Sequence, residues 1–148
     1  MFEEKTERER TDIYLKGTDR SSAVMRLENL IKSNNNQPIV IRSKDGEEAK
    51  LSKNSIQKLV SEDAIKKSVD NGFKREQHFA AVADIDNLFK NSVKVLSHPD
   101  RNNDPNIKAM HRFAAPLFGD NAAYITVKEA TEHGKRIYSV ELIEMRKQ

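Results

Sequence analysis

Two histidines and two arginines lie close together in the second half of the chain. His98 and Arg101 belong to residues 96–101, and His111 and Arg112 belong to residues 107–113. Cleavage of a phosphodiester without a metal needs one group that takes a proton, one that gives a proton, and positive charge where the transition state becomes negative. Imidazole and guanidinium side chains supply all three. These two stretches are therefore the first candidate for a catalytic site.

The histidines differ in where the sequence puts them. His98 lies in a polar, irregular segment before a predicted sheet, where a rigid scaffold can hold a mobile catalytic group. His78 lies near the start of a predicted helix and is either functional or structural. His111 is on a predicted strand, where it either transfers protons or faces inward and orients other groups through hydrogen bonds. Two imidazoles with ordinary pKa values of about 6.5 suffice for acid and base catalysis at neutral pH, and the sequence leaves open which two act.

The composition limits the other kinds of chemistry. The 148 residues suffice for one compact core and are few for two domains of ordinary size. The chain has no cysteine, which excludes disulfides, thiolate metal ligands and a cysteine nucleophile. A formal net charge of +3 permits an RNA or DNA partner without demonstrating one. There is no long apolar run and no signal-peptide pattern, so we expect a soluble chain with no membrane partner.

A metal site would be a competing use of the same segment. His98, Asp100 and Asp104 offer nitrogen and oxygen donors, but their spacing matches neither a His-x-x-x-His pair nor a calcium loop. The sequence also has no glycine-rich phosphate loop and no Gly-x-Ser-x-Gly elbow. We therefore expect no metal and no other cofactor.

Helical periodicity and turn signals organise the first part of the chain. The mixed charges of residues 3–10 predict a solvated or frayed end. After them we expect a short helix from about residue 19 to 32, a hairpin over residues 38–51, two helical pieces over residues 55–70, and one main core helix over residues 75–90. The turn of the hairpin is expected at Asp45-Gly46.

The last part of the chain changes from helical to alternating periodicity. Strands are predicted over residues 107–117, 122–130 and 135–145, and their short connectors predict an antiparallel meander. The fold class is thus α+β, with N-terminal helices and a small hairpin followed by a C-terminal antiparallel sheet. Residues 1–36 are interpreted as an N-terminal extension or linker with a short helix, and residues 37–148 as the functional domain.

Alternation along the strands assigns side chains to two faces. The core face is expected to carry Ile125, Val127, Tyr138, Val140 and Leu142. The open face is then expected to carry Arg112, Thr126, Lys128, Ser139 and Glu141. Such cations and hydroxyls can hold and orient a phosphodiester. The exposed face of any antiparallel sheet carries similar residues, so a purely structural interpretation stays open.

The chain resembles a domain of polyvalent proteins from phages and mobile elements. The resemblance runs from about residue 37 to residue 144 and is clearest at residues 71–73, 78–89, 98–100, 107–113, 125–129 and 138–139. That family resembles the barnase, EndoU, colicin and RelE-like nuclease group, whose small α+β domains place helices before a curved antiparallel sheet. The resemblance implies metal-independent cleavage of RNA through a 2′,3′-cyclic phosphate, often by a toxin.

The matching polar positions become candidate site residues. The resemblance implies His98 or His78 as general base or acid, with His111 as a third candidate. It implies phosphate stabilisation and substrate positioning by four further residues, Arg112, Lys128, Thr126 and Ser139. The predicted RNA-binding residues are Arg101, Lys108 and Tyr138. No residue has to correspond to the glutamate base of barnase-type enzymes, and Glu141 is a candidate only by its position on a strand.

The sequence therefore predicts a metal-independent endoribonuclease of the toxin or effector type, derived from a phage or mobile element, that cleaves RNA by attack of the 2′-hydroxyl. The expected partners are RNA, with tRNA among the candidates, and a cognate immunity or antitoxin protein. The expected location is the cytoplasm, either of the producing cell or of a target cell. The alternative is a non-catalytic module that binds nucleic acid or protein within a polyvalent mobile-element protein.

Overall fold

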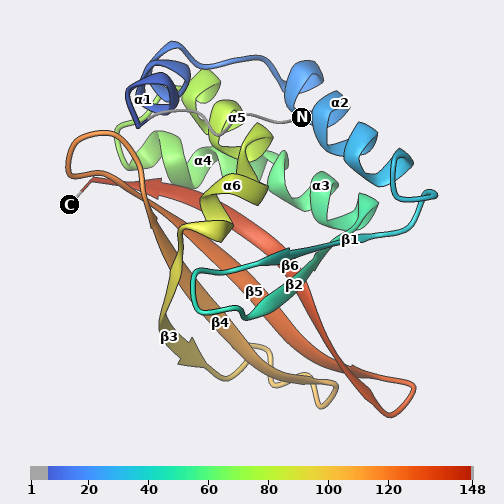
Figure 1. Cartoon of the computed structure of the whole chain (residues 1–148). Helices are drawn as coiled ribbons and strands as arrows, with labels where there is room; N and C mark the ends of the chain where they lie inside the picture. The colour runs from blue at the N-terminus through green and yellow to red at the C-terminus, as the bar shows by residue number, and fades with distance from the viewer. Residues whose placement is uncertain (1–6, 148) are drawn as a thin grey trace.

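The computed structural model describes residues 7–147, and its helices gather at one end of a curved sheet (Figure 1). The helices in this range are α1 Glu7–Lys16, α2 Arg20–Lys32, α3 Lys53–Leu59, α4 Glu62–Asp70, α5 Arg75–Ala83 and α6 Ile85–Lys90. The strands are β1 Ile39–Arg42, β2 Glu48–Leu51, β3 Val93–His98, β4 Ile107–Pro116, β5 Ala122–Glu132 and β6 Lys135–Arg146. They form one sheet in the order β1-β2-β6-β5-β4-β3. The predicted α+β class with a C-terminal antiparallel meander is confirmed.

Several elements differ from the prediction. His98, predicted to lie in an irregular segment, is the last residue of the edge strand β3, which is antiparallel to β4. The helix predicted over residues 75–90 is two helices, α5 and α6. The sheet is mixed, because β2 runs parallel to β6. Residues 7–10 of the predicted frayed end belong to α1, and residues 3–6 lie outside the described residues.

The break between α5 and α6 is held by side chains from the first two helices. The backbone of Asp84, with φ −105° and ψ 19°, leaves the helical region. The Tyr14 hydroxyl donates to the Asp84 carboxylate, and Arg26 donates to the Ala83 carbonyl and, at 2.7 Å, to Asp86. A carbonyl at the end of a helix needs such a partner. These partners are distant in sequence, so apolar periodicity could not predict the break.

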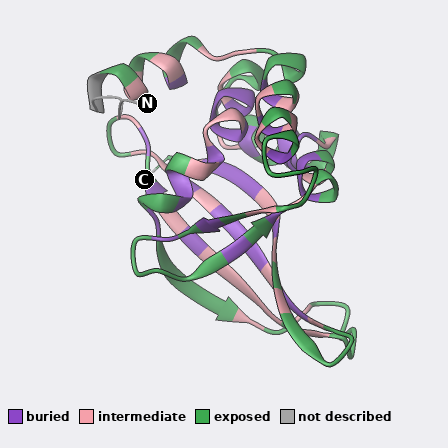
Figure 2. Ribbon diagram, turned by 45° about the vertical axis from the view of Figure 1, so that its right-hand side comes forward, coloured by how far each residue is buried: buried purple, intermediate pink, exposed green. Residues whose placement is uncertain are grey.

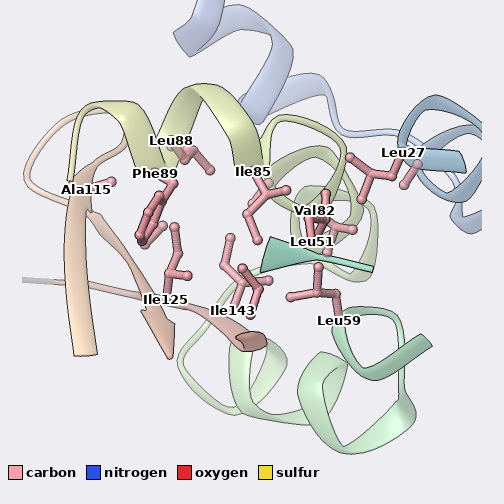
Figure 3. Close-up of a cluster of buried hydrophobic side chains, with 14 of the residues drawn as sticks. Leu27, Leu51, Leu59, Val82, Ile85, Leu88, Phe89, Ala115, Ile125 and Ile143 are labelled. Carbon is pink, nitrogen blue, oxygen red and sulfur yellow. The ribbon is translucent and has the colours of Figure 1, made fainter. Parts of the chain in front are cut away.

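The core lies between the helices and the adjoining end of the sheet (Figure 3). The Phe89 ring of α6 is fully buried, and its centroid lies 4.8 Å from that of Phe113 on β4. Ile125 and Ile143 are paired across β5 and β6 and are also fully buried. Leu27 brings α2, part of the predicted N-terminal extension, into the same core. Burying each such side chain contributes about 1.5–3 kcal/mol.

A bulge in β6 changes which residues face the core. Thr126 pairs with Leu142 and Val127 pairs with Val140, so Glu141 is an extra residue on β6. Leu142 consequently lies on the side of the sheet opposite to Val140. The prediction that Leu142 belongs to the core face is wrong, because strict alternation does not continue through a bulge.

The meander strands extend beyond the helices, and the short β1–β2 hairpin lies beside this uncovered part of the sheet (Figure 1). Burial decreases from the helix-covered end toward the turn between β5 and β6 (Figure 2). The hairpin is attached on two sides. Lys50 is paired with Ser139 of β6, and the Lys44 N–H donates to the Ser92 carbonyl at 3.0 Å. These attachments place the hairpin beside the polar side chains described next.

Candidate functional site

The sheet face that packs against the helices becomes polar where the helices end. Ile125 of β5 belongs to the core. Two residues further along is Val127, paired with His111 of β4, and two further is Glu129, paired with Tyr138 of β6. Side chains two residues apart on a strand share a face. We call this face, which carries Ile125, Val127 and Glu129, the inner face.

A cleft of about 490 Å³ opens on the inner face. Glu47 and Glu48 of the hairpin line one side of it, and Phe113 and Val127 provide apolar surface. The remaining lining is polar and comes from strands β3 to β6, through Lys94, His111, Glu129, Arg136 and Tyr138. The cleft therefore brings together three carboxylates, an imidazole, two cations and two aromatic rings.

A chain of hydrogen bonds joins three strands beside this cleft. His111 Nε2 lies 2.7 Å from Glu129 Oε1, and His111 Nδ1 lies 2.7 Å from Ser97 Oγ. Because a carboxylate only accepts hydrogen bonds, Nε2 carries the proton that it donates to Glu129. Ser97 donates to Nδ1 when the imidazole is neutral and accepts from Nδ1 when it is charged. The side chains of His111 and Glu129 are 12% and 10% exposed, so both are held in place and still reachable.

Two cations at the cleft are each paired with one carboxylate. Arg136 Nη1 lies 3.1 Å from Glu129 Oε2, and the Arg136 side chain is 62% exposed. Lys94 Nζ lies 3.2 Å from Glu47, and both side chains are well exposed. Exposed ion pairs are weak, and an arginine has five N–H donors. Both cations can therefore also bind an anion that enters the cleft.

Tyr138 provides the aromatic surface. Its ring centroid lies 6.2 Å from that of His111, with the two planes inclined at 33°. Tyr138 is 37% exposed. An exposed aromatic ring beside cations is suited to stacking on an unpaired base.

Five other predicted residues lie on the opposite side of the sheet, which we call the outer face. The register aligns His98 of β3 with Met110, Lys128 and Ser139, and it aligns Arg112 with Thr126. The predicted sharing of one face by Arg112, Thr126, Lys128 and Ser139 is thus observed, but the prediction that this face is open is wrong at Thr126, which is buried. The two cations have acidic partners there: Lys128 lies 2.9 Å from Glu141, and Arg112 lies 3.9 Å from Glu144. The register therefore separates this set from His111 and Tyr138.

His98 and the turn after it stand apart from the cleft. His98 is the last residue of β3 rather than part of a loop, and its Nδ1 donates to the Pro99 carbonyl at 2.8 Å. Arg101 and Lys108 are exposed at the turn and at the start of β4.

Among the described residues, no group of three or more histidine, aspartate or glutamate side chains is arranged to hold a metal ion. Within residues 7–147, no helix combines the length and apolarity needed to cross a bilayer.

His78 is buried beneath the helices. It is fully buried, with Nδ1 2.7 Å from Ser68 Oγ and Nε2 2.9 Å from the Leu59 carbonyl. Burial lowers the pKa of this imidazole, which favours the neutral form. His78 thus connects α4 and α5 to the end of α3 and does not line the cleft.

Six polar residues of the cleft and its hydrogen-bond chain are not among the sequence-based candidates: Glu47, Glu48, Lys94, Ser97, Glu129 and Arg136. A usable signal exists for two of them. Glu129 follows Ile125 and Val127 at a spacing of two, and Arg136 precedes Tyr138 and Val140 at the same spacing. A charged residue in the register of buried apolar residues indicates that an apolar face has become polar. Ser97 and Lys94 carry no such signal, because β3 is an almost entirely exposed strand.

Comparison with known proteins gives one family. The model of the family described as large polyvalent protein-associated domain 3 matches residues 18–138. The match includes α2, which lies outside the resemblance noted in the sequence, and it ends inside β6. No curated protein and no solved structure matches the chain.

Proposed function

This chain belongs to the large polyvalent protein-associated domain 3 family, and we propose that its cleft cleaves RNA without a metal ion. The observation that carries the proposal is the Ser97–His111–Glu129 hydrogen-bond chain, which lies beside two cations and an aromatic ring in one cleft. A proton acceptor, a proton donor and positive charge are the requirements for this reaction.

In the proposed reaction, Glu129 and His111 act as a pair. The Glu129 carboxylate accepts the proton of the 2′-hydroxyl while the 2′-oxygen attacks phosphorus. The bond from phosphorus to the 5′-oxygen breaks, and the charged His111 imidazole gives that oxygen a proton through Nδ1. The products are a 2′,3′-cyclic phosphate and a free 5′-hydroxyl. His111 Nε2 keeps the proton that it donates to Glu129 throughout the reaction. Glu129 then loses its extra proton to water and Nδ1 takes one from water, which restores the starting state.

The cations and the tyrosine position the substrate. Arg136 offers a planar set of donors to the phosphate oxygens, and Lys94 offers a mobile charge across the cleft. Both stabilise the negative charge that grows on the phosphate in the transition state. Tyr138 stacks on the base of the nucleoside that carries the attacking hydroxyl.

We further propose that the domain belongs to the barnase, EndoU, colicin and RelE-like nuclease group and acts as a toxin or effector. The observed order of helices before a curved sheet supports this grouping. In this proposal Glu129 takes the role of the glutamate base. Glu141, the candidate from the sequence by its strand position alone, does not take that role. The domain would act in the cytoplasm of its own or a target cell, under control of a cognate immunity protein.

The proposal is tested with purified protein, a short single-stranded RNA and EDTA. We expect the wild-type chain to cut the RNA and to leave DNA of the same sequence intact, because DNA lacks the attacking hydroxyl. His111→Gln should lower the cleavage rate by about 10²- to 10⁴-fold. The matched control is His98→Gln, on the outer face, which should cut at the wild-type rate. Full activity of His111→Gln, or loss of cleavage in EDTA, would contradict the proposal.

The same samples distinguish the alternative function. A non-catalytic module would bind RNA with an affinity that falls with salt, as phosphate contacts require, and would leave the RNA intact. In that case binding should depend on Arg136 and Lys94 and should persist in His111→Gln.

A further inference from the structure

We infer that the site holds two adjacent nucleosides, with the upstream base in the cleft, the downstream base in a second hollow, and the linking phosphate at Arg136. The inference rests on the proposed function and specifies its substrate as a single-stranded dinucleotide step. The starting observation is a hollow of about 130 Å³ next to the cleft.

The second hollow lies at the seam between β2 and β6. Within the described chain, the pairing of these two strands consists of Lys50 with Ser139 alone. Before that point along both strands, Glu48 and Arg136 line a gap rather than a continuous ladder. The hollow therefore results from the short parallel pairing between the hairpin and the meander.

The lining of the second hollow suits one nucleobase. Val40 and Ile137 supply apolar walls, Tyr138 supplies an aromatic edge, and the rest of the accessible lining is charged. Pockets that enclose a whole drug-sized ligand measure about 300–1,000 Å³. The cleft, at about 490 Å³, lies in that range, and the hollow, at about 130 Å³, is large enough only for a smaller planar group.

The two spaces share three residues, Glu48, Arg136 and Tyr138. A phosphate that links a nucleoside in the cleft to one in the hollow must therefore pass these three residues, of which Arg136 is the cation. The Arg136 contact to Glu129 involves one terminal nitrogen, which leaves other N–H donors of the guanidinium for the phosphate.

This arrangement also sets the direction of the RNA. The 2′-hydroxyl that attacks belongs to the upstream nucleoside, which must lie in the cleft beside Glu129 and His111. The downstream nucleoside, which keeps the 5′-oxygen, then lies in the second hollow. Two bases in separate spaces on either side of Tyr138 cannot be paired in a duplex, so the substrate is single-stranded.

The experiment compares an intact short RNA with the same RNA lacking the base downstream of the cut. Wild-type kcat/KM should fall by about 5- to 150-fold when that base is absent, the value of one stacked base. Val40→Trp should fill the hollow and cut both RNAs with the same low efficiency. Val40 is 48% exposed, so the fold should tolerate the change, and Val40→Phe provides a milder filling. The matched control Val95→Trp, 52% exposed on the edge strand β3, should behave as wild type.

Binding separates failure of this inference from failure of the proposed function. Both RNAs are also made with 2′-deoxyribose at the upstream nucleoside, and their affinities are measured by fluorescence anisotropy. If the wild-type chain cuts no RNA, the proposed function is refuted. The inference about the second hollow still predicts that the wild-type chain binds the RNA without the base more weakly than the intact RNA, and that Val40→Trp binds the two RNAs equally. Equal affinity and equal cleavage of the two RNAs by the wild-type chain would overturn the inference.

Discussion

Replacing Glu129 by glutamine removes the proposed base and keeps the shape of the side chain. The Glu129 side chain is 10% exposed and contacts His111 at 2.7 Å and Arg136 at 3.1 Å. The amide oxygen of glutamine can still accept the proton of His111 Nε2, so the hydrogen bond can remain. An amide cannot take the proton of a 2′-hydroxyl. Glu129→Gln should therefore inactivate the site without unfolding the domain.

The size of both effects follows from these contacts. Loss of a general base should lower the cleavage rate by about 10²- to 10⁴-fold, which corresponds to about 2.7–5.5 kcal/mol in activation free energy. Weakening of the charged contacts with His111 and Arg136 should lower the free energy of unfolding by about 1–3 kcal/mol. A domain of ordinary stability stays folded after such a loss.

Glu141→Gln is the matched control. Glu141 lies on the same sheet, its side chain is 14% exposed, and it contacts Lys58 at 2.5 Å and Lys128 at 2.9 Å. It does not line the cleft, so Glu141→Gln should lose a similar amount of stability and no activity. Cleavage is followed with a fluorescent RNA in EDTA, and stability by urea unfolding. Equal cleavage rates for Glu129→Gln and Glu141→Gln would refute the assignment of the base.

Three further results are expected. Ser97→Ala should lower the cleavage rate by about 2- to 10-fold, because the hydroxyl orients His111, and should leave the melting temperature unchanged because Ser97 is exposed. The free energy of unfolding should fall as pH decreases below about 6.5, with a slope of up to about 1.4 kcal/mol per pH unit. The reason is that burial lowers the pKa of His78, so the unfolded chain binds a proton that the folded chain does not. His78→Gln should remove this slope in urea titrations. Phe89→Ala should cost about 3–5 kcal/mol of stability in the same titrations, whereas the exposed-site control Val95→Ala should change it by less than about 0.5 kcal/mol.

Elements with a continuous buried face could be predicted from the sequence. The alternation of residues 122–130 predicted β5, and the Asp45-Gly46 turn predicted the hairpin. Strand β3 could not be predicted in the same way, because five of its six residues are exposed and show no alternation. Its place at the edge of the sheet depends on pairing with β4, a contact between distant parts of the chain.

The candidate site could be predicted only in part for the same reason. His111 and Tyr138 were candidates and line the cleft, but their partners Ser97 and Glu129 come from two other strands. The sequence predicted the site on the opposite face of the sheet, which carries Arg112 and the residues aligned with it. The cleft lies instead on the face that also contributes to the core. It forms because the strands extend past the helices and the hairpin lies beside them, and these tertiary features could not be predicted from the sequence.

The end groups of the cleaved RNA test the proposed chemistry most directly. A short single-stranded RNA is incubated with the wild-type chain in EDTA, and the products are identified by phosphorus NMR and mass spectrometry. We expect a 2′,3′-cyclic phosphate on the upstream product and a free 5′-hydroxyl on the downstream product, and neither with Glu129→Gln. Intact RNA, or products that carry a 5′-phosphate, would contradict the proposal.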